Sequence, residues 1–467
     1  MRVLEAHPAF SYNDGSLPIH RKNARRRVPL DLILAFLLFI VAMAASLAVG
    51  ATMILPMILG LAAFALVALR RGFRARPLVG MCLRGMRQSL VVVLVMLMIG
   101  CLTALWRQCG TIAYFTYYGV RLVPPGIFVL AAFLLSSIMS YALGTSFGVA
   151  GTVGVILMTI ARASGASAPL VGGAILSGLY FGDRGSPMAS SASLVANETG
   201  TDVSRNFRLM LRSALLPMAL CAVFYALLSL SGAPGSTDST LLEDFAREFV
   251  LSPWCLLPTL FMLVLAFAGV KIKFVMAADI LVSILICVLL QGAPLSRVLS
   301  AMLLGFAPET ATLAPILSGG GVRSMLEIVT LLLLSSGCAG IFEGTHLLSG
   351  LEDALRRLSR RIGRFPAMVC ASLAVCAVFC NQTIGIIMCR QCMSGNYAST
   401  PEGRVELMLD IENSVVVLAG LVPWCIACSV PLRMLGCDLR ALPFAAYLYL
   451  LPLCWQLTLR LRSRRRA

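Results

Sequence analysis

The sequence predicts an all-α polytopic membrane protein with about 12 transmembrane helices, some of them broken or re-entrant. Of its 467 residues, 59% are hydrophobic and only 13% are charged, whereas about 25% of the residues of a soluble domain are charged. The apolar residues also fall in runs of about 17–25, the length that crosses a hydrocarbon core as a helix. A transmembrane β-barrel would instead show alternating segments of about ten residues.

The apolar runs follow one another along the chain. A tight hairpin is expected over 29–50 and 52–69, and a run over 89–106 follows a basic loop. Further segments are expected over 125–143, 149–160, 169–181, 207–230, 253–270, 274–291, 302–317, 325–342, 365–389, 415–432 and 442–459. Those too short to span the bilayer are candidates for re-entrant segments.

Charge and polarity divide the chain into parts. We expect a cytoplasmic basic N-terminal tail over 1–28, a first transmembrane half over 29–230, a polar connecting loop over 231–250, a second transmembrane half over 251–459 and a basic cytoplasmic tail over 460–467. Arginines cluster at 21–27, 70–76, 356–364 and 460–466. Cytoplasmic loops carry such an excess of basic residues. The sequence therefore predicts an integral protein of the cell (inner) membrane with both termini cytoplasmic and an even number of crossings.

The net charge of +17 does not indicate a nucleic-acid partner, because the arginines lie between apolar runs, where they set membrane orientation. The lipid bilayer is the expected partner, with a secondary attraction to anionic headgroups. A homodimer is one assembly that the sequence allows. Two C-x-x-C pairs, Cys389/Cys392 and Cys425/Cys428, lie in apolar surroundings far from any histidine. We interpret them as buried small hydrophobic residues, and we expect no structural metal and no cofactor.

Each half contains one badly interrupted apolar stretch: 144–152 together with 182–193 in the first, and 379–396 in the second. Broken segments in corresponding positions of two halves indicate the substrate site of a transporter. An enzyme is not expected, since no nucleophile–base pair or metal motif stands out. A non-transporting membrane scaffold or sensor is a third hypothesis.

In the first half, Asp183 is the sole carboxylate of a long apolar run. A lone carboxylate can hold a proton or a cation, but not both at once, and this competition is the physical basis of cation/proton exchange. The alternative is a loop at the membrane interface with a solvated Asp183–Arg184 pair. Thr145 and Ser146 lie in a glycine-rich patch that offers neutral oxygens to a desolvated cation. Packing of small residues between helices is the alternative there.

In the second half, Asn381, Gln382 and Thr383 supply polar oxygens. Arg390 lies within apolar sequence, and we favour snorkelling to an interface over a substrate role. Glu412 and Ser414 precede another apolar run, where acidic residues also serve as helix caps. Glu309 and Glu343 are interpreted as solvated helix ends.

These patches, in this order, resemble the NhaC-type sodium/proton antiporter family of the ion transporter superfamily. The stretch MSYALGTSFGVAGTVGVIL (139–157) is similar to that family's G-T-S-W-G-T-x-G-T-V-G, and LSGLYFGDRGSPM (176–188) is similar to its S-G-x-x-F-G-D-K-x-S-P-L. Segments 85–123, 319–345 and 411–424 follow family patterns as well. The resemblance covers roughly residues 30–455.

The resemblance implies a secondary active transporter that exchanges Na⁺ for H⁺, built from two inverted repeats whose broken helices meet near the bilayer midplane. It also implies that Asp183 alternates between a proton and a cation and that Glu412 lies on the opposite wall. The neutral oxygens would come from Thr145, Ser146, Ser186, Ser190, Asn381 and Thr383. Ser414 completes the set of candidate binding residues.

Three carboxylates of the family pattern are missing, at Ser190, Ile386 and Asn413. A site with less negative charge should bind Na⁺ more weakly, because a hard cation needs charged or numerous oxygen ligands. Arg390 lies one helical turn past the missing second carboxylate, where it would favour an anionic substrate or pair with Asp183 or Glu412. The alternative function is therefore a Na⁺- or H⁺-coupled exchanger of an organic anion or amino acid.

Overall fold

The computed structural model describes residues 30–122, 124–231, 239–345 and 351–464. Across these ranges the chain is helical, and the one β-type contact is an isolated antiparallel bridge between Phe306 and Gly319. The all-α prediction is therefore confirmed. The predicted N-terminal tail over 1–28 lies outside the described residues.

The first half of the chain forms eleven α-helices in the described ranges. They are α1 (Leu30–Val49), α2 (Ile54–Arg70), α3 (Ala75–Gln88), α4 (Leu90–Gln108), α5 (Thr111–Leu122), α6 (Phe128–Leu143), α7 (Ser146–Val149), α8 (Val155–Ala163), α9 (Ala168–Gly185), α10 (Ser190–Thr199) and α11 (Val203–Ser231). A single π-type turn, Ala150–Gly154, joins α7 to α8. Turns of this kind occur frequently at functional sites.

The rest of the described chain continues with α12 (Ser239–Glu248), α13 (Leu257–Phe267), α14 (Ile272–Leu289), α15 (Leu295–Leu304), α16 (Ala314–Leu317), α17 (Gly321–Thr345), α18 (Leu351–Ile362), α19 (Arg364–Phe379), α20 (Gln382–Met393), α21 (Pro401–Glu412), α22 (Val415–Leu418), α23 (Ile426–Leu435) and α24 (Ala446–Arg464). Short 3-10 turns lie at Pro125–Ile127, Pro253–Leu256, Ser394–Asn396, Ala419–Leu421 and Leu439–Phe444.

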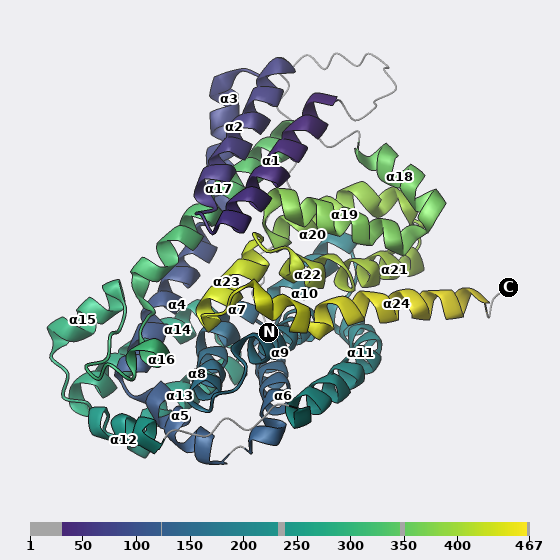
Figure 1. Ribbon diagram of the computed structural model, residues 1–467. Helices are drawn as coiled ribbons and strands as arrows, with labels where there is room; N and C mark the ends of the chain where they lie inside the picture. Colours follow the sequence, from purple (N-terminus) through teal and green to yellow (C-terminus); the bar gives the residue numbers. More distant parts are fainter. Residues whose placement is uncertain (1–29, 123, 232–238, 346–350, 465–467) are drawn as a thin grey trace.

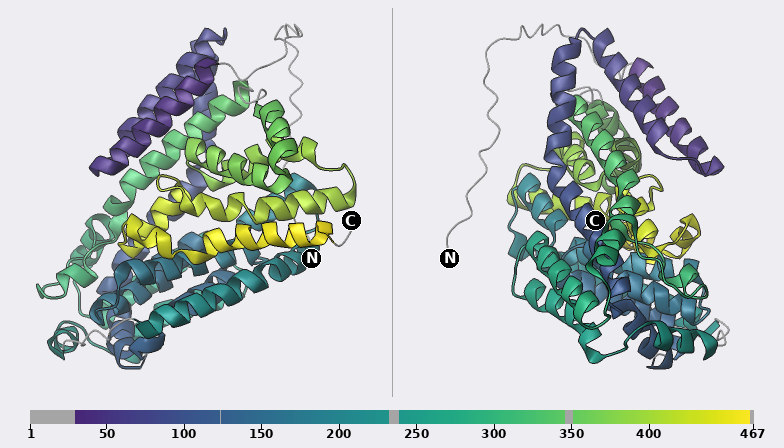
Figure 2. Two further views of the ribbon diagram at one scale, coloured as in Figure 1. Left: turned by 45° about the vertical axis from the view of Figure 1, so that its right-hand side comes forward. Right: turned by 90° about the vertical axis from the view of Figure 1, so that its left-hand side faces the viewer.

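The helices form two neighbouring groups (Figures 1 and 2). The α1–α2 hairpin lies with α3 against the long α17, which also packs along α4. In the second group, α6 packs along α9, and α11 lies beside α6 and α24. The two groups meet where α23 contacts α17 and the turn after α7.

Six helices of the described chain are long and apolar enough to cross a membrane, and up to eight spans result if each of two bent pairs counts as one. The bent pairs are Leu241–Glu248 with Pro253–Leu265, at 93°, and Pro401–Leu421 with Ile426–Leu435, at 53°. Apolar helices such as α6 and α19 fall below the length of a full span. The predicted count of about 12 crossings is higher than this and stays a prediction.

Two of the predicted polar segments contain helix. The polar stretch 231–250 is not only a loop, because it carries α12, whose Phe245 is fully buried. The predicted tail over 460–467 begins inside α24, which continues to Arg464. In both places the sequence is polar on average, and a helix with only a few buried apolar residues extends into it.

The contact between α6 and α9 is close because α9 presents glycines to α6. A Cβ atom on Gly178 would lie 2.1 Å from the Ser136 hydroxyl oxygen, and one on Gly182 would lie 2.0 Å from the Ser140 carbonyl carbon. Small residues allow helix backbones to approach in this way in membranes. The packing fixes the last turn of α9, which carries Asp183.

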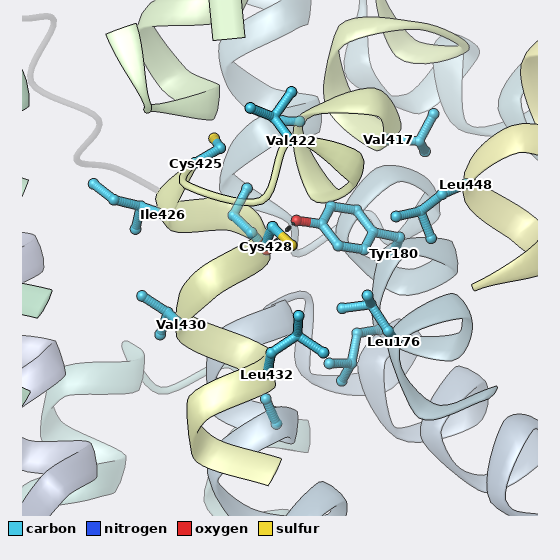
Figure 3. Packing of buried hydrophobic residues seen from close by; sticks show 14 of the residues in the cluster. Leu176, Tyr180, Val417, Val422, Cys425, Ile426, Cys428, Val430, Leu432 and Leu448 are labelled. Atoms are coloured by element: carbon cyan, nitrogen blue, oxygen red, sulfur yellow. Dashed lines mark hydrogen bonds between the residues drawn. The ribbon is translucent and has the colours of Figure 1, made fainter. Parts of the chain in front are cut away.

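Tyr180, one turn before Asp183, ties α9 to α23 (Figure 3). Its hydroxyl donates a 2.6 Å hydrogen bond to the carbonyl of Ala427. The ring is 1% exposed, and Figure 3 shows it among Leu176, Val417, Cys428 and Leu448. A buried tyrosine hydroxyl needs such a partner, so this bond sets the distance between the two helices.

Candidate functional site

The first helix break separates α6 from α7. Gly144 has φ +64 and ψ +26, and a Cβ atom there would lie 2.5 Å from the backbone of Met188. Glycine is required at this point because it alone adopts the left-handed conformation freely and leaves room for the neighbouring chain. Thr145 follows in an extended conformation, and its hydroxyl accepts a hydrogen bond from the Gly148 amide at 3.3 Å.

The second helix break separates α19 from α20 and has nearly the same backbone. Cys380 has φ +54 and ψ +17, and it is the one non-glycine residue of the described chain with positive φ. Asn381 follows in an extended conformation and accepts a hydrogen bond from the Thr383 amide at 2.9 Å. The Cys380 carbonyl in turn accepts the Ile426 amide at 2.8 Å. Strained backbone of this kind concentrates at functional sites.

Asp183 connects the two breaks. Its carboxylate is 5% exposed and accepts a 3.0 Å hydrogen bond from Nε2 of Gln382, which lies at the second break. From the first break, Ser146 donates to it with both its backbone amide and its hydroxyl. The carbonyl oxygen of Asp183 accepts the Ser191 hydroxyl. The carboxylate therefore has three donor groups. Among the described side chains, no basic group forms an ion pair with it within 4 Å.

A cavity of about 520 Å³ opens at this carboxylate. Six of the nine predicted binding residues line it: Thr145, Ser146, Asp183, Ser190, Asn381 and Thr383. Gln382 and Lys271 line it as well. The cavity thus combines one buried acidic group with neutral oxygens contributed by both halves of the chain.

A family model described as the Na⁺/H⁺ antiporter family matches residues 178–455. This match covers more than half of the chain and includes Asp183, the second break and Glu412. The chain belongs to the Na⁺/H⁺ antiporter family. The resemblance seen in the sequence is thereby confirmed, as is the expectation of a secondary antiporter.

Curated relatives of this Na⁺/H⁺ antiporter cover most of its length. The malate-2H⁺/Na⁺-lactate antiporter of Bacillus subtilis is 26% identical over 402 residues, which is 85% of this chain and 84% of that protein. The Na⁺/H⁺ antiporter NhaC of Alkalihalophilus pseudofirmus is 25% identical over 375 residues, covering 79% and 81%. The arginine/ornithine antiporter ArcD of Halobacterium salinarum is 26% identical over 353 residues, covering 73% of each chain.

Arg184 of this antiporter is completely buried beside the cavity. Its guanidinium donates to Asn413 Oδ1 at 2.7 Å, to the Ser213 hydroxyl at 2.6 Å and to the Met210 carbonyl at 3.1 Å. All of these partners are neutral. Because Asp183 and Arg184 are both buried, the alternative of a solvated loop pair is wrong.

Glu412, in the last turn of α21, is 1% exposed. Neither of its carboxyl oxygens has a hydrogen-bond partner within the described parts of the chain. It does not line the Asp183 cavity, although its charge interacts with those of Arg184 and Asp183. The helix-cap interpretation of Glu412 is wrong, since a cap would accept backbone amides.

Ser186 and Ser414 do not line the cavity and are engaged in local hydrogen bonds. The Ser186 hydroxyl accepts the Met188 amide at 3.1 Å. The Ser414 hydroxyl donates to the Asp410 carbonyl and accepts from Ser372 at 3.2 Å. These two serines stabilise the chain just after α9 and α21, and the structure gives them no direct place in the cavity.

Arg390 does not reach Asp183 or Glu412. Its Nε donates to the Glu198 carbonyl at 3.0 Å and lies 3.9 Å from a Glu198 carboxylate oxygen, with 43% of the Arg390 side chain exposed. Pairing with Asp183 or Glu412, the alternative to snorkelling, is therefore wrong, and the favoured snorkelling interpretation agrees with this exposed position. The Arg297–Glu309 ion pair is likewise exposed, and so is Glu343.

Asp410 holds a separate buried cluster two residues before Glu412. Its two carboxylate oxygens accept from Trp455 Nε1 at 2.8 Å and from the Tyr397 hydroxyl at 2.7 Å, and Arg364 Nε lies 3.5 Å away. Burial, together with the neighbouring Asp410 carboxylate, raises the pKa of Tyr397. The phenol therefore stays protonated and donates, which makes this cluster a structural anchor for α21.

Two lining residues were missed or undervalued by the sequence analysis. Gln382 was noted as polar but not selected, although its amide is the one side-chain nitrogen that contacts Asp183. Lys271 was not considered because it lies between two apolar runs and looks like a loop cation. The four cysteines of the C-x-x-C pairs are buried, as expected.

Proposed function

We propose that this antiporter exchanges Na⁺ for H⁺, with Asp183 binding the two ions in turn. The observation that carries the proposal is a nearly buried carboxylate facing a cavity lined with neutral oxygens from two helix breaks. Hard cations prefer oxygen ligands, and a buried charge is tolerated when it is compensated. Either a bound Na⁺ or a proton supplies that compensation.

We assign Glu412 the role of a second ionisable group of the site. Its two oxygens lack protein partners, and an ionised carboxylate buried in this way is costly unless a proton or cation accompanies it. Arg184 lies close enough to act on it. Glu412 is thus suited to hold a proton in the state in which the site carries no cation.

We propose further that the two halves are inverted repeats, giving about 12 crossings in an inner membrane with both termini cytoplasmic. The backbone angles support this: Thr145 has φ −147 and ψ +121, and Asn381 has φ −142 and ψ +124, each following a left-handed residue. Transporters of inverted-repeat design place such broken helices around the substrate. A homodimer is the assembly we would test first.

The experiment is ²²Na⁺ uptake into proteoliposomes driven by an imposed pH gradient. The purified full chain should accumulate Na⁺ when the lumen is acidic, and an outward Na⁺ gradient should in turn move protons inward. Protein-free liposomes and a protonophore provide the controls. A Na⁺ gradient that never moves protons would overturn the proposal.

The same vesicles test exchange of an organic anion or amino acid. That alternative was motivated by the missing carboxylates and by a cation at Arg390, and Arg390 instead contacts Glu198. We therefore expect Na⁺/H⁺ exchange to proceed with no organic solute present. A requirement for a carboxylate or amino-acid substrate would show that the alternative holds.

We expect Asn413→Asp to tighten Na⁺ binding. Asn413 Oδ1 lies 2.7 Å from Arg184 Nη2, so an aspartate would neutralise the arginine and make the site more negative. At an effective dielectric constant of about 20 a charge several ångströms away contributes on the order of 1–2 kcal/mol, or roughly tenfold in affinity. The half-saturating Na⁺ concentration should fall accordingly.

Asn413→Ala is the matched control, because it removes the same amide without adding charge. It should leave Na⁺ affinity within about twofold and lower thermal stability, since Arg184 then loses an acceptor. Equal Na⁺ affinities in the aspartate and alanine variants would contradict this electrostatic explanation.

A further inference from the structure

A second cavity of about 210 Å³ lies where the ends of α4, α8 and α23 meet the start of α17. Arg107, Arg162 and Arg433 line it, together with the glycine loop at 319–320. Its lining residues within the described chain include no aspartate or glutamate. It is separate from the Asp183 cavity, with which it shares no lining residue.

Arg107 is the most deeply placed of these cations, at 7% exposed. Its Nη1 donates to the Thr103 carbonyl of its own helix at 2.8 Å, while the buried Nε has no hydrogen-bond partner in the described chain. Nη2 lies 4.0 Å from the Cβ position of Gly319 and so points toward the glycine loop. Burying a guanidinium without a counter-charge is costly.

The two arginines beside it differ in how the protein compensates their positive charge. Arg433 forms a two-pronged ion pair with Glu327, at 2.5 and 3.0 Å. Arg162 instead donates from Nη2 to the carbonyls of Leu435 and Gly436, at 2.9 and 2.8 Å, and no described carboxylate lies within 4 Å of it. Arg162 is near enough to repel Arg107, so two cations share the cavity without an anion.

The helix that starts at the cavity adds to this positive potential. Gly319, Gly320 and Gly321 all have positive φ, at +127, +75 and +80, and a Cβ atom on Gly320 would lie 2.6 Å from the Ala104 amide. The loop therefore lies directly against α4 near Arg107. The 25-residue α17 leaves its first amides without intrahelical partners, and its N-terminus carries a partial positive charge.

From these contacts we infer that this cavity binds a small oxyanion, a carboxylate or phosphate group, between Arg107, Arg162 and the first turn of α17. Guanidinium groups and helix N-termini both recognise such oxygens directly. The anion supplies the charge that neither arginine obtains from the protein. Its source is a free solute or the phosphate of an anionic lipid.

The test uses the full chain, purified and delipidated in a neutral detergent. Thermal unfolding is recorded with increasing inorganic phosphate, against chloride at equal ionic strength. The wild type should gain several degrees in Tm, because a ligand that binds only the folded state stabilises it. A parallel series with phosphatidylglycerol in place of phosphate identifies the lipid source.

Arg107→Gln should abolish this Tm gain, and its Tm without anion should equal or exceed that of the wild type, since an uncompensated buried cation is gone. Arg162→Gln should also lose the gain, with a lower starting Tm because the end of α23 loses its donor. Arg87→Gln, an exposed arginine on α3 that does not line this cavity, is the matched control and should behave as the wild type.

A gain with phosphate, or with the anionic lipid alone, that disappears in Arg107→Gln supports the inference and names the source. If the wild type and Arg107→Gln showed the same Tm gain with phosphate and the same Tm gain with the lipid, the inference would be overturned. A lower Tm of Arg107→Gln without anion, together with a retained response, would make Arg107 a purely structural residue and would overturn it too.

Discussion

Replacement of Asp183 by asparagine removes Na⁺-driven proton movement while leaving the protein folded. The asparagine keeps the shape and can still interact with Gln382 and Ser146, but it can neither release a proton nor attract a cation. Loss of a charged ligand costs roughly 3 kcal/mol, which corresponds to about a hundredfold weaker Na⁺ binding. Transport of ²²Na⁺ in proteoliposomes and Na⁺ binding in detergent measure the two effects separately.

The pH dependence of Na⁺ binding provides a second measurement of the role of Asp183. In the wild type, protons compete for the carboxylate, so Na⁺ binding should weaken as the pH falls through its titration range. In Asp183→Asn this competition is absent, and the residual binding should lose that dependence. Glu343→Gln, which removes an exposed carboxylate of α17, should retain wild-type transport. Normal exchange in the Asp183→Asn protein would refute the assignment of this residue.

The second large effect is expected from Gly182→Ala, which should severely destabilise the protein. The added methyl group would lie 2.0–2.4 Å from the backbone of Ser140 and Tyr141. Backbone cannot give way as a flexible side chain does, so α6 and α9 must separate. Overpacking of this kind costs roughly 1–3 kcal/mol, and sometimes more. The loss of stability is measured by the yield of monodisperse protein and by its Tm in detergent.

Gly185→Ala is the matched control on the same helix. A Cβ atom at Gly185 meets nothing within 4 Å, so this variant should keep the wild-type Tm within a degree or two. If both alanine variants were equally stable, the close packing of α6 on α9 would not be a requirement of the fold.

The residues that interrupt apolar runs made the site predictable from the sequence. Gly144 and Thr145 in the first half, and Asn381 in the second, are polar or flexible where a helix should continue, and each lies at an observed break. Asp183 was selected because a carboxylate within an apolar run is energetically costly and marks a candidate functional site. The sequence could not tell that Ser186 and Ser414 turn away from the cavity, since one hydroxyl resembles another until its hydrogen bonds are known.

Other features depend on contacts between distant segments. Lys271 lines the cavity because α14 starts beside it. Arg390 lies outside the site because it contacts Glu198 on α10. Asp279 on α14 was not singled out, yet it is fully buried and accepts from Trp106 Nε1 at 3.1 Å. Hydropathy alone cannot fix the number of spans, because it measures composition and cannot detect where a backbone turns back.

Arg184 has a consequence for how tightly the two ion flows must be coupled. Among the buried groups, ionised Asp183 and Glu412 with the fixed positive charge of Arg184 leave one negative charge in excess, and one Na⁺ or one proton cancels it. Lys271 is exposed at the cavity wall and is not one of these buried charges. A loaded site can then rearrange within the bilayer without moving net charge through a medium of low polarity, whereas an empty one pays a large electrostatic penalty. We therefore expect slippage, the return of the carrier without a bound ion, to be rare.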